Sequence, residues 1–139
     1  MELKTEILIN AEPRKVWGIL TDFKNYPNWN PFIKSLTGNI KIGNQIKVEL
    51  QGMTFKPKVL TFKKEKEFSW LGHLLVKGIF DGEHLFKLTD NKNGTTKFEQ
   101  SEKFKGILVP LLKKKLITET KDGFIEMNKR LKIETEKKH

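Results

Sequence analysis

The sequence predicts an α+β fold in which a curved antiparallel sheet packs against one long C-terminal helix. Apolar residues recur with helical spacing near the end of the chain, whereas most of the preceding sequence alternates between apolar and polar residues. Short turns separate the alternating segments, and strands joined by short turns pair in antiparallel fashion. One amphipathic helix covers only one face of a sheet, so a sheet that curls around the helix buries both apolar surfaces. The length of 139 residues suffices for one domain, spanning residues 1–139, with its own core.

The long helix is predicted over residues 107–136. Its inward stripe consists of residues three or four positions apart, namely Leu112, Leu116, Thr120, Phe124, Met127 and Leu131. The opposite face is rich in lysine and glutamate, which predicts one side in the core and the other in water. Pro110 is compatible with a first turn, because its missing N–H has no partner there. Gly123 costs about 1 kcal/mol against alanine in mid-helix, and it indicates a close-packing point or a local weakness rather than a hinge.

The chain begins with one strand and two short helical segments. Residues 3–9 alternate between mainly apolar and charged side chains, which predicts a strand with one buried face. Pro13 opens a short helix whose apolar residues share one face. Residues 21–25 are predicted to form a turn or a second short helix. Residues 26–32 contain two prolines, and each proline biases the residue before it towards extended geometry, so this aromatic connector is not expected to be a regular helix.

Six further strands are predicted between the short helices and the long helix. They are expected at residues 33–37, 46–51, 55–63, 68–76, 80–89 and 95–104. Pro57 indicates an edge position or a bulge within its strand, because proline cannot donate to the ladder. Residues 90–94 are dense in turn formers and join the last two strands as a hairpin. With the first strand, the predicted sheet has seven strands.

Polar residues on the inner face of the last hairpin are the most informative feature of the sequence. His84 alternates in step with Phe86, and Gln100 and Glu102 alternate in step with Phe104, so all three polar side chains are predicted to point inward. Depending on register, His84 lies opposite Gln100 or Glu102. Buried polar groups must meet each other, a water molecule or a ligand. They therefore form either a satisfied internal polar cluster or the groups that fix the polar end of a ligand in an apolar pocket.

Catalytic and metal chemistry have weak support in the sequence. The only catalytic candidates are His84 as an acid and Glu102 as a base. Because such a pair alone does not identify a reaction, no catalytic residue is assigned. No cysteine is present, and neither His73 nor His139 has an acidic or histidine partner at metal-ligand spacing. We expect neither a bound metal nor a cofactor.

The lysine-rich composition gives a formal net charge of +10, which would attract polyanions at long range. The lysines are interspersed with glutamates, as in residues 63–67, and the aromatic residues alternate at core positions. This pattern favours a solvated surface over a nucleic-acid interface. No apolar run approaches the roughly 20 residues of a membrane span, so a soluble, cytoplasmic protein is expected. The pattern predicts no particular oligomeric state.

Several short motifs, in this order, resemble a known superfamily over nearly the whole chain. They are Trp29-Asn30-Pro31-Phe32, Gly82-Glu83-His84-Leu85-Phe86, Gly94-Thr95-Thr96, residues 102–108 and residues 123–128. Together with the run of elements, they resemble the polyketide cyclase/dehydrase-like branch of the START/Bet v 1-like superfamily, also called SRPBCC. The resemblance implies a helix-grip fold, in which a curved seven-stranded antiparallel sheet wraps around the long C-terminal helix and two short helices close one end.

The resemblance also implies a set of functions, because such folds commonly hold an apolar cavity between sheet and helix. We expect non-catalytic binding of a hydrophobic small molecule or lipid in this cavity. The alternatives are a cyclase or dehydratase that uses His84 and Glu102, and a partner-binding module like the Hsp90 co-chaperones of related fold. The candidate ligand-binding residues are Trp29, Phe32, Phe55, Trp70, His84, Phe86, Gln100, Glu102, Leu112 and Leu116, although the aromatic ones among them also suit a packed core.

Overall fold

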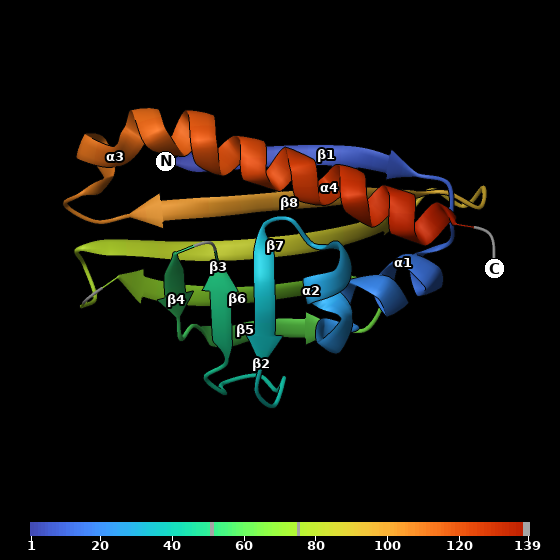
Figure 1. Cartoon of the computed structure of the whole chain (residues 1–139), viewed down its shortest axis with the longest axis horizontal. Helices are drawn as coiled ribbons and strands as arrows, with labels where there is room; N and C mark the ends of the chain where they lie inside the picture. The colour runs from blue at the N-terminus through green and yellow to red at the C-terminus, as the bar shows by residue number, and fades with distance from the viewer. Residues whose placement is uncertain (51, 75, 138–139) are drawn as a thin grey trace.

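Two antiparallel sheets and a long C-terminal helix make up the architecture (Figure 1). The computed structural model describes residues 1–50, 52–74 and 76–137. The larger sheet has the order β1-β8-β7-β6-β5, with β1 (Glu2–Ile9), β5 (Lys58–Lys63), β6 (Glu67–Leu74), β7 (Phe80–Asp90) and β8 (Thr96–Lys105). The smaller sheet has the order β2-β3-β4, with β2 (Ile33–Thr37), β3 (Lys47–Leu50) and β4 (Met53–Phe55). The predicted α+β, helix-grip class is thereby confirmed.

The described residues contain eight strands because the predicted strand 55–63 divides at Pro57. Proline has no N–H for the ladder, so β4 ends before it and β5 starts after it, each in a different sheet. A bridge between Gln45 and Lys58 connects the two sheets at this point. Gln51 and Leu75, which the sequence analysis assigned to strands, lie outside the described residues.

The segment between β1 and β2 is more helical than the sequence predicts. It contains α1 (Pro13–Leu20), a 3₁₀ turn η1 (Phe23–Asn25) and α2 (Tyr26–Trp29). The expectation that residues 26–32 avoid helix is therefore wrong for the first four of them. Pro27 lies in the first turn of α2, where its missing N–H removes no intrahelical bond. The helix ends at Asn30, whose extended backbone is the geometry expected before Pro31.

The C-terminal helix is continuous through three segments, α3 (Val109–Lys115), the π-helical η2 (Leu116–Thr120) and α4 (Lys121–Glu136). Along the predicted stripe, Leu116, Phe124, Met127 and Leu131 are buried, while Leu112 and Thr120 are half-buried. Figure 1 shows this helix running along β1 and β8. Among the described residues, no helix combines the length and the apolar character that crossing a bilayer requires.

Gly123 lies where the helix closely approaches the segment before β2. A Cβ atom at this position would lie 2.7 Å from Cδ1 of Phe32, closer than side chains pack. The prediction of a close-packing point at Gly123 is therefore confirmed. The glycine lets the Phe32 ring pack against the helix surface, edge-on to the ring of Phe124 at 5.3 Å.

The buried apolar residues form two clusters that differ in position. The larger one fills the space between the main sheet, α1, α2 and α4 and includes Trp29, Phe68 and Phe86. The smaller one lies beneath the start of the C-terminal helix and includes Phe104 and Leu116. Phe32 packs against both clusters, so it lies at their junction.

Candidate ligand cavity

An apolar cavity of about 370 Å³ lies between the two sheets and the start of the C-terminal helix. Its wall is formed by β3 and β4 of the small sheet, by β6, β7 and β8 of the large sheet, and by the helical segments α3 and η2. The volume is within the range of small-molecule sites, which is about 300–1,000 Å³. Most lining side chains are aliphatic or aromatic, so the cavity suits an apolar ligand.

The structure brings together most of the residues that the sequence analysis proposed for ligand contact. The ones that line the cavity are Phe32, Phe55, Trp70, His84, Glu102, Leu112 and Leu116. They come from four strands, the segment before β2 and the C-terminal helix, which are distant in sequence. Their role in ligand binding stays a prediction.

Three of the proposed contact residues are in the packed core and do not line the cavity. Trp29 is buried against the edge of Tyr26, with ring centroids 5.4 Å apart. Phe86 is fully buried one inward position beyond His84, and Gln100 is fully buried between sheet and helix. Phe86 and Gln100 share an inner strand face with cavity residues, and alternation does not show where core ends and cavity begins. Trp29 lies in α2, and its aromatic character suited core and cavity equally.

Several cavity residues were missed by the sequence analysis, although a signal for some of them was present. Gly72 and Leu74 continue the inward alternation of β6 beyond Trp70, and Phe80 and Gly82 precede His84 on the same face of β7. Val48, Leu50 and Met53 complete the wall from the small sheet. Their contribution depends on how the small sheet folds over the large one, which alternation alone does not specify.

The polar wall of the cavity is built on the hairpin of β7 and β8. His84 pairs with Glu102 in the ladder, and its ring bonds both predicted partners: Nδ1 lies 2.6 Å from Oε1 of Glu102, and Nε2 lies 2.9 Å from Oε1 of Gln100. The ring stacks on Trp70 at 4.9 Å and meets the edge of Phe124 at 5.0 Å. His84 is 2% exposed, whereas the side chain of Glu102 is 18% exposed. Glu102 is therefore the member of the pair that reaches the open space.

The hydrogen bonds of this wall continue into the core. Nε2 of Gln100 lies 2.8 Å from Oδ1 of Asn128, and Nδ2 of Asn128 lies 2.9 Å from Oγ1 of Thr5. Oγ1 of Thr5 donates to the backbone carbonyl of Gln100 at 2.8 Å, which closes the chain. The inward polar residues thus satisfy one another, as one of the two sequence interpretations proposed. Asn128 was missed, although it follows the inward-facing Phe124 by four residues.

Gly82 leaves the space that the carboxylate of Glu102 occupies. A Cβ atom at position 82 would overlap Oε2 of Glu102, and its backbone φ does not otherwise require glycine. The second carboxylate oxygen therefore lies directly over β7, beside the cavity that both residues line.

Comparison with known proteins agrees with this architecture. The family described as "Polyketide cyclase / dehydrase and lipid transport" matches residues 1–132. The chain belongs to this family. The match confirms the resemblance seen in the sequence motifs. No curated protein sequence matches the chain.

Solved structures similar to this family member share its fold at low sequence identity. A hypothetical protein of Helicobacter pylori superposes with a TM-score of 0.83 at 16% identity, covering 97% of this chain and 88% of that one. A START superfamily protein of Mycobacterium smegmatis gives 0.70 at 19%, covering 95% and 97%. The di-domain ARO/CYC protein BexL, from the BE-7585A biosynthetic pathway, gives 0.76 at 10%, covering 99% of this chain and 48% of that one.

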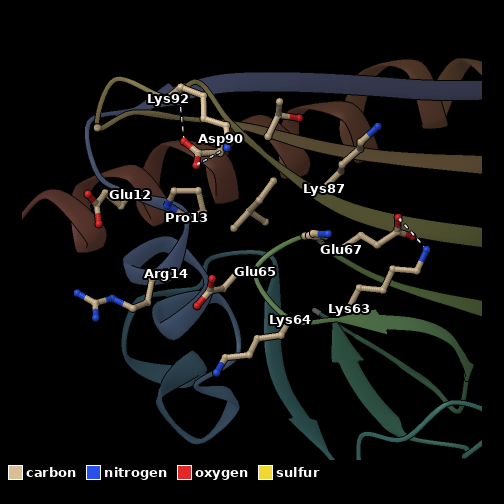
Figure 2. Close-up of a pocket in the computed structure, with 14 residues that line it drawn as sticks. Glu12, Pro13, Arg14, Lys63, Lys64, Glu65, Glu67, Lys87, Asp90 and Lys92 are labelled. Atoms are coloured by element: carbon tan, nitrogen blue, oxygen red, sulfur yellow. Dashed lines mark hydrogen bonds and ion pairs between the residues drawn. The ribbon is translucent and has the colours of Figure 1, made fainter.

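A second, larger hollow of about 830 Å³ lies at the end of β6 and β7 that is farther from the apolar cavity (Figure 2). It is lined by the start of α1, the turn at residues 63–67 and the β7–β8 loop, and most of its side chains are charged. Figure 2 shows carboxylates and ammonium groups interspersed, with ion pairs between Lys63 and Glu67 and between Lys92 and Asp90. This mixed, solvated surface lacks the apolar wall that a small-molecule site requires.

His73 has an acidic partner that the sequence analysis did not find. Asp81 lies directly opposite it on β7, with Nδ1 of His73 2.7 Å from Oδ1 of Asp81. The sequence analysis considered only partners at metal-ligand spacing, whereas Asp81 is brought to His73 by the register of β6 and β7. The hydrogen bond from His73 lowers the pKa of Asp81 below its ordinary value. No group of three potential ligands in the described part of the chain is arranged to hold a metal, and His139 lies outside that part.

Proposed function

We propose that the protein binds one largely apolar small molecule or lipid in the cavity of about 370 Å³ and does not transform it. The observation that carries this proposal is the combination of a largely apolar wall with a buried polar cluster at one side. Apolar ligands gain from leaving water in proportion to the area they bury, and a few placed polar groups orient them. The lipid transport part of the family description and the fold shared with a START superfamily protein support the same class of ligand.

An enzyme of the cyclase or dehydratase type is the second candidate, since His84 and Glu102 are in contact at the cavity. The geometry favours binding over catalysis. Both ring nitrogens of His84 are already hydrogen-bonded inside the protein, so the ring has no free atom to offer a substrate. Proton transfer would depend on Glu102 alone, without the second catalytic group that such reactions usually employ.

The cytoplasmic location expected from the sequence stays a prediction.

Native mass spectrometry of the purified protein, followed by solvent extraction, tests the binding proposal. We expect a 1:1 complex whose extract contains an apolar molecule and whose bound mass disappears after exchange against an added apolar competitor. Extract of the buffer wash is the control for loosely associated material. A protein that is empty as purified, and whose NMR spectrum responds to no member of a broad apolar ligand set, would contradict the proposal.

A further inference from the structure

We propose that the cavity selects an uncharged ligand carrying a hydroxyl or N–H group, and that this group donates a hydrogen bond to Oε2 of Glu102. This inference rests on the proposed binding function and adds the polarity of the ligand to it. It follows from the direction of each hydrogen bond in the buried chain from Thr5 to Glu102, taken one bond at a time.

The direction of the chain is fixed at its inner end by a backbone carbonyl. The carbonyl oxygen of Gln100 can only accept, so Oγ1 of Thr5 donates its single hydrogen there. Oγ1 of Thr5 must then accept from Asn128, which places the amide nitrogen of Asn128 towards Thr5. The amide oxygen of Asn128 consequently faces Gln100 and accepts from its Nε2. All three residues are buried, so water does not compete for these bonds.

A second backbone carbonyl fixes the orientation of Gln100 independently. Nε2 of Gln100 lies 3.4 Å from the carbonyl oxygen of Phe124 as well as 2.8 Å from Oδ1 of Asn128. Reversing the amide would bring two oxygens together against Phe124 with no hydrogen between them. Oε1 of Gln100 therefore faces His84, and because this oxygen only accepts, Nε2 of His84 must carry a hydrogen.

One proton remains to be assigned, between Nδ1 of His84 and Oε1 of Glu102, which are 2.6 Å apart. A contact this short requires a hydrogen between the two atoms. Since Nε2 is already protonated, the pair is either imidazolium with carboxylate or neutral imidazole with carboxylic acid. Both forms carry no net charge, so the polar wall of the cavity is electrically neutral as a unit.

Oε2 of Glu102 is an acceptor in both of these forms. In the ionic form it is a carboxylate oxygen, and in the neutral form it is the carbonyl oxygen of an acid whose hydrogen is on Oε1. It lies over Gly82 at the cavity wall. A ligand hydroxyl or N–H group satisfies it, whereas a ligand carboxylate or phosphate would place acceptor against acceptor. A charged ligand group would also be buried beside a neutral pair without a counterion, which is costly.

The other polar side chains of the wall do not change this assignment. Lys115 lines the cavity, but its side chain is 70% exposed and its ammonium lies 3.9 Å from Glu119. An anion at Lys115 would remain at the solvent-exposed rim, where ion pairs contribute little. Thr120 is half-buried on the helix and its hydroxyl can both donate and accept, so it does not discriminate between ligands.

Three probes that differ only in the polar group test the inference: 2-naphthol, 2-methoxynaphthalene and 2-naphthoate, each titrated by its own fluorescence at neutral pH. We expect 2-naphthol to bind about tenfold or more tighter than 2-methoxynaphthalene, because it alone donates to Glu102, and 2-naphthoate to bind most weakly. Equal affinity for the first two, or tight binding of 2-naphthoate, would overturn the inference and leave the binding function standing. Binding of none of the three would count against the binding function itself.

Two variants make the test specific to Glu102. In Glu102→Leu the acceptor is removed, so the preference for 2-naphthol should fall below about twofold. In Glu102→Gln the amide nitrogen can donate to Nδ1 of His84 and leave the amide oxygen facing the cavity, so the preference should persist. A preference unaltered in Glu102→Leu overturns the inference. If Glu102→Leu does not fold, the ¹⁵N spectrum of His84 in the unaltered protein decides, since an unprotonated Nε2 would contradict the assigned chain.

Discussion

Gly72→Leu is expected to weaken ligand binding strongly while leaving the protein at least as stable as before. Gly72 lies on the inward face of β6 and lines the cavity. A Cβ atom there would meet only the Pro57 side chain, at an ordinary 3.6 Å, so the new side chain extends into open space. The leucine side chain then fills part of the cavity that a ligand would occupy. The affinity for 2-methoxynaphthalene, measured by fluorescence titration, should therefore fall by about tenfold to a hundredfold.

Gly18→Leu is the matched control for this experiment. Gly18 is exposed on α1, and a Cβ atom at that position has no neighbour within 4 Å. This substitution adds the same side chain at a helix position far from the cavity, so the affinity for 2-methoxynaphthalene should be unchanged. Wild-type affinity in a folded Gly72→Leu protein would mean that the ligand occupies another place.

Gln100→Leu is expected to destabilise the protein strongly. Gln100 is fully buried and connects the strand pair to the helix. Its loss leaves the ring N–H of His84 and the amide oxygen of Asn128 without partners, at about 1–3 kcal/mol each. We expect the free energy of unfolding to fall by about 3 kcal/mol and the Tm by about 10 °C, measured by urea and thermal denaturation.

Gln45→Leu provides the comparison for the loss of a glutamine amide. Gln45 is exposed, and its Nε2 donates to the carbonyl of Lys56 at 2.9 Å. Since water can replace that bond, the loss should stay below about 1 kcal/mol. Equal destabilisation by the two substitutions would show that the buried chain of hydrogen bonds contributes nothing beyond a surface contact.

The fold was predictable because its periodicities are local. Alternation along β1, β7 and β8 and the stripe from Leu112 to Leu131 depend only on which residues must face a common core. The same alternation predicted His84, Gln100 and Glu102 as inward-facing, and burial required that they be paired. This part of the site follows from the sequence. A polar residue that alternates in step with aromatic residues lies on the buried face of its strand, where it must be hydrogen-bonded.

The remaining features depend on tertiary relations that periodicity does not contain. Pro57 was recognised as an irregularity, but that it divides one strand between two sheets depends on how the small sheet folds over. Phe86 and Trp70 alternate identically, and only the closure of the sheet makes the first core and the second cavity wall. The contact of His73 with Asp81 depends on register across a hairpin. Helix α2 formed despite Pro27 because a first turn tolerates proline.

The binding site is tested most directly by locating a bound apolar molecule inside the protein. Intermolecular NOEs are measured between 2-methoxynaphthalene and a protein sample with ¹³C-labelled methyl groups. We expect NOEs to the methyl groups that line the cavity, in particular those of Val48, Leu112 and Leu116. NOEs confined to the exposed side chains of Ile42, Ile107 or Leu111 would contradict it, because the ligand would then bind the surface and not the cavity.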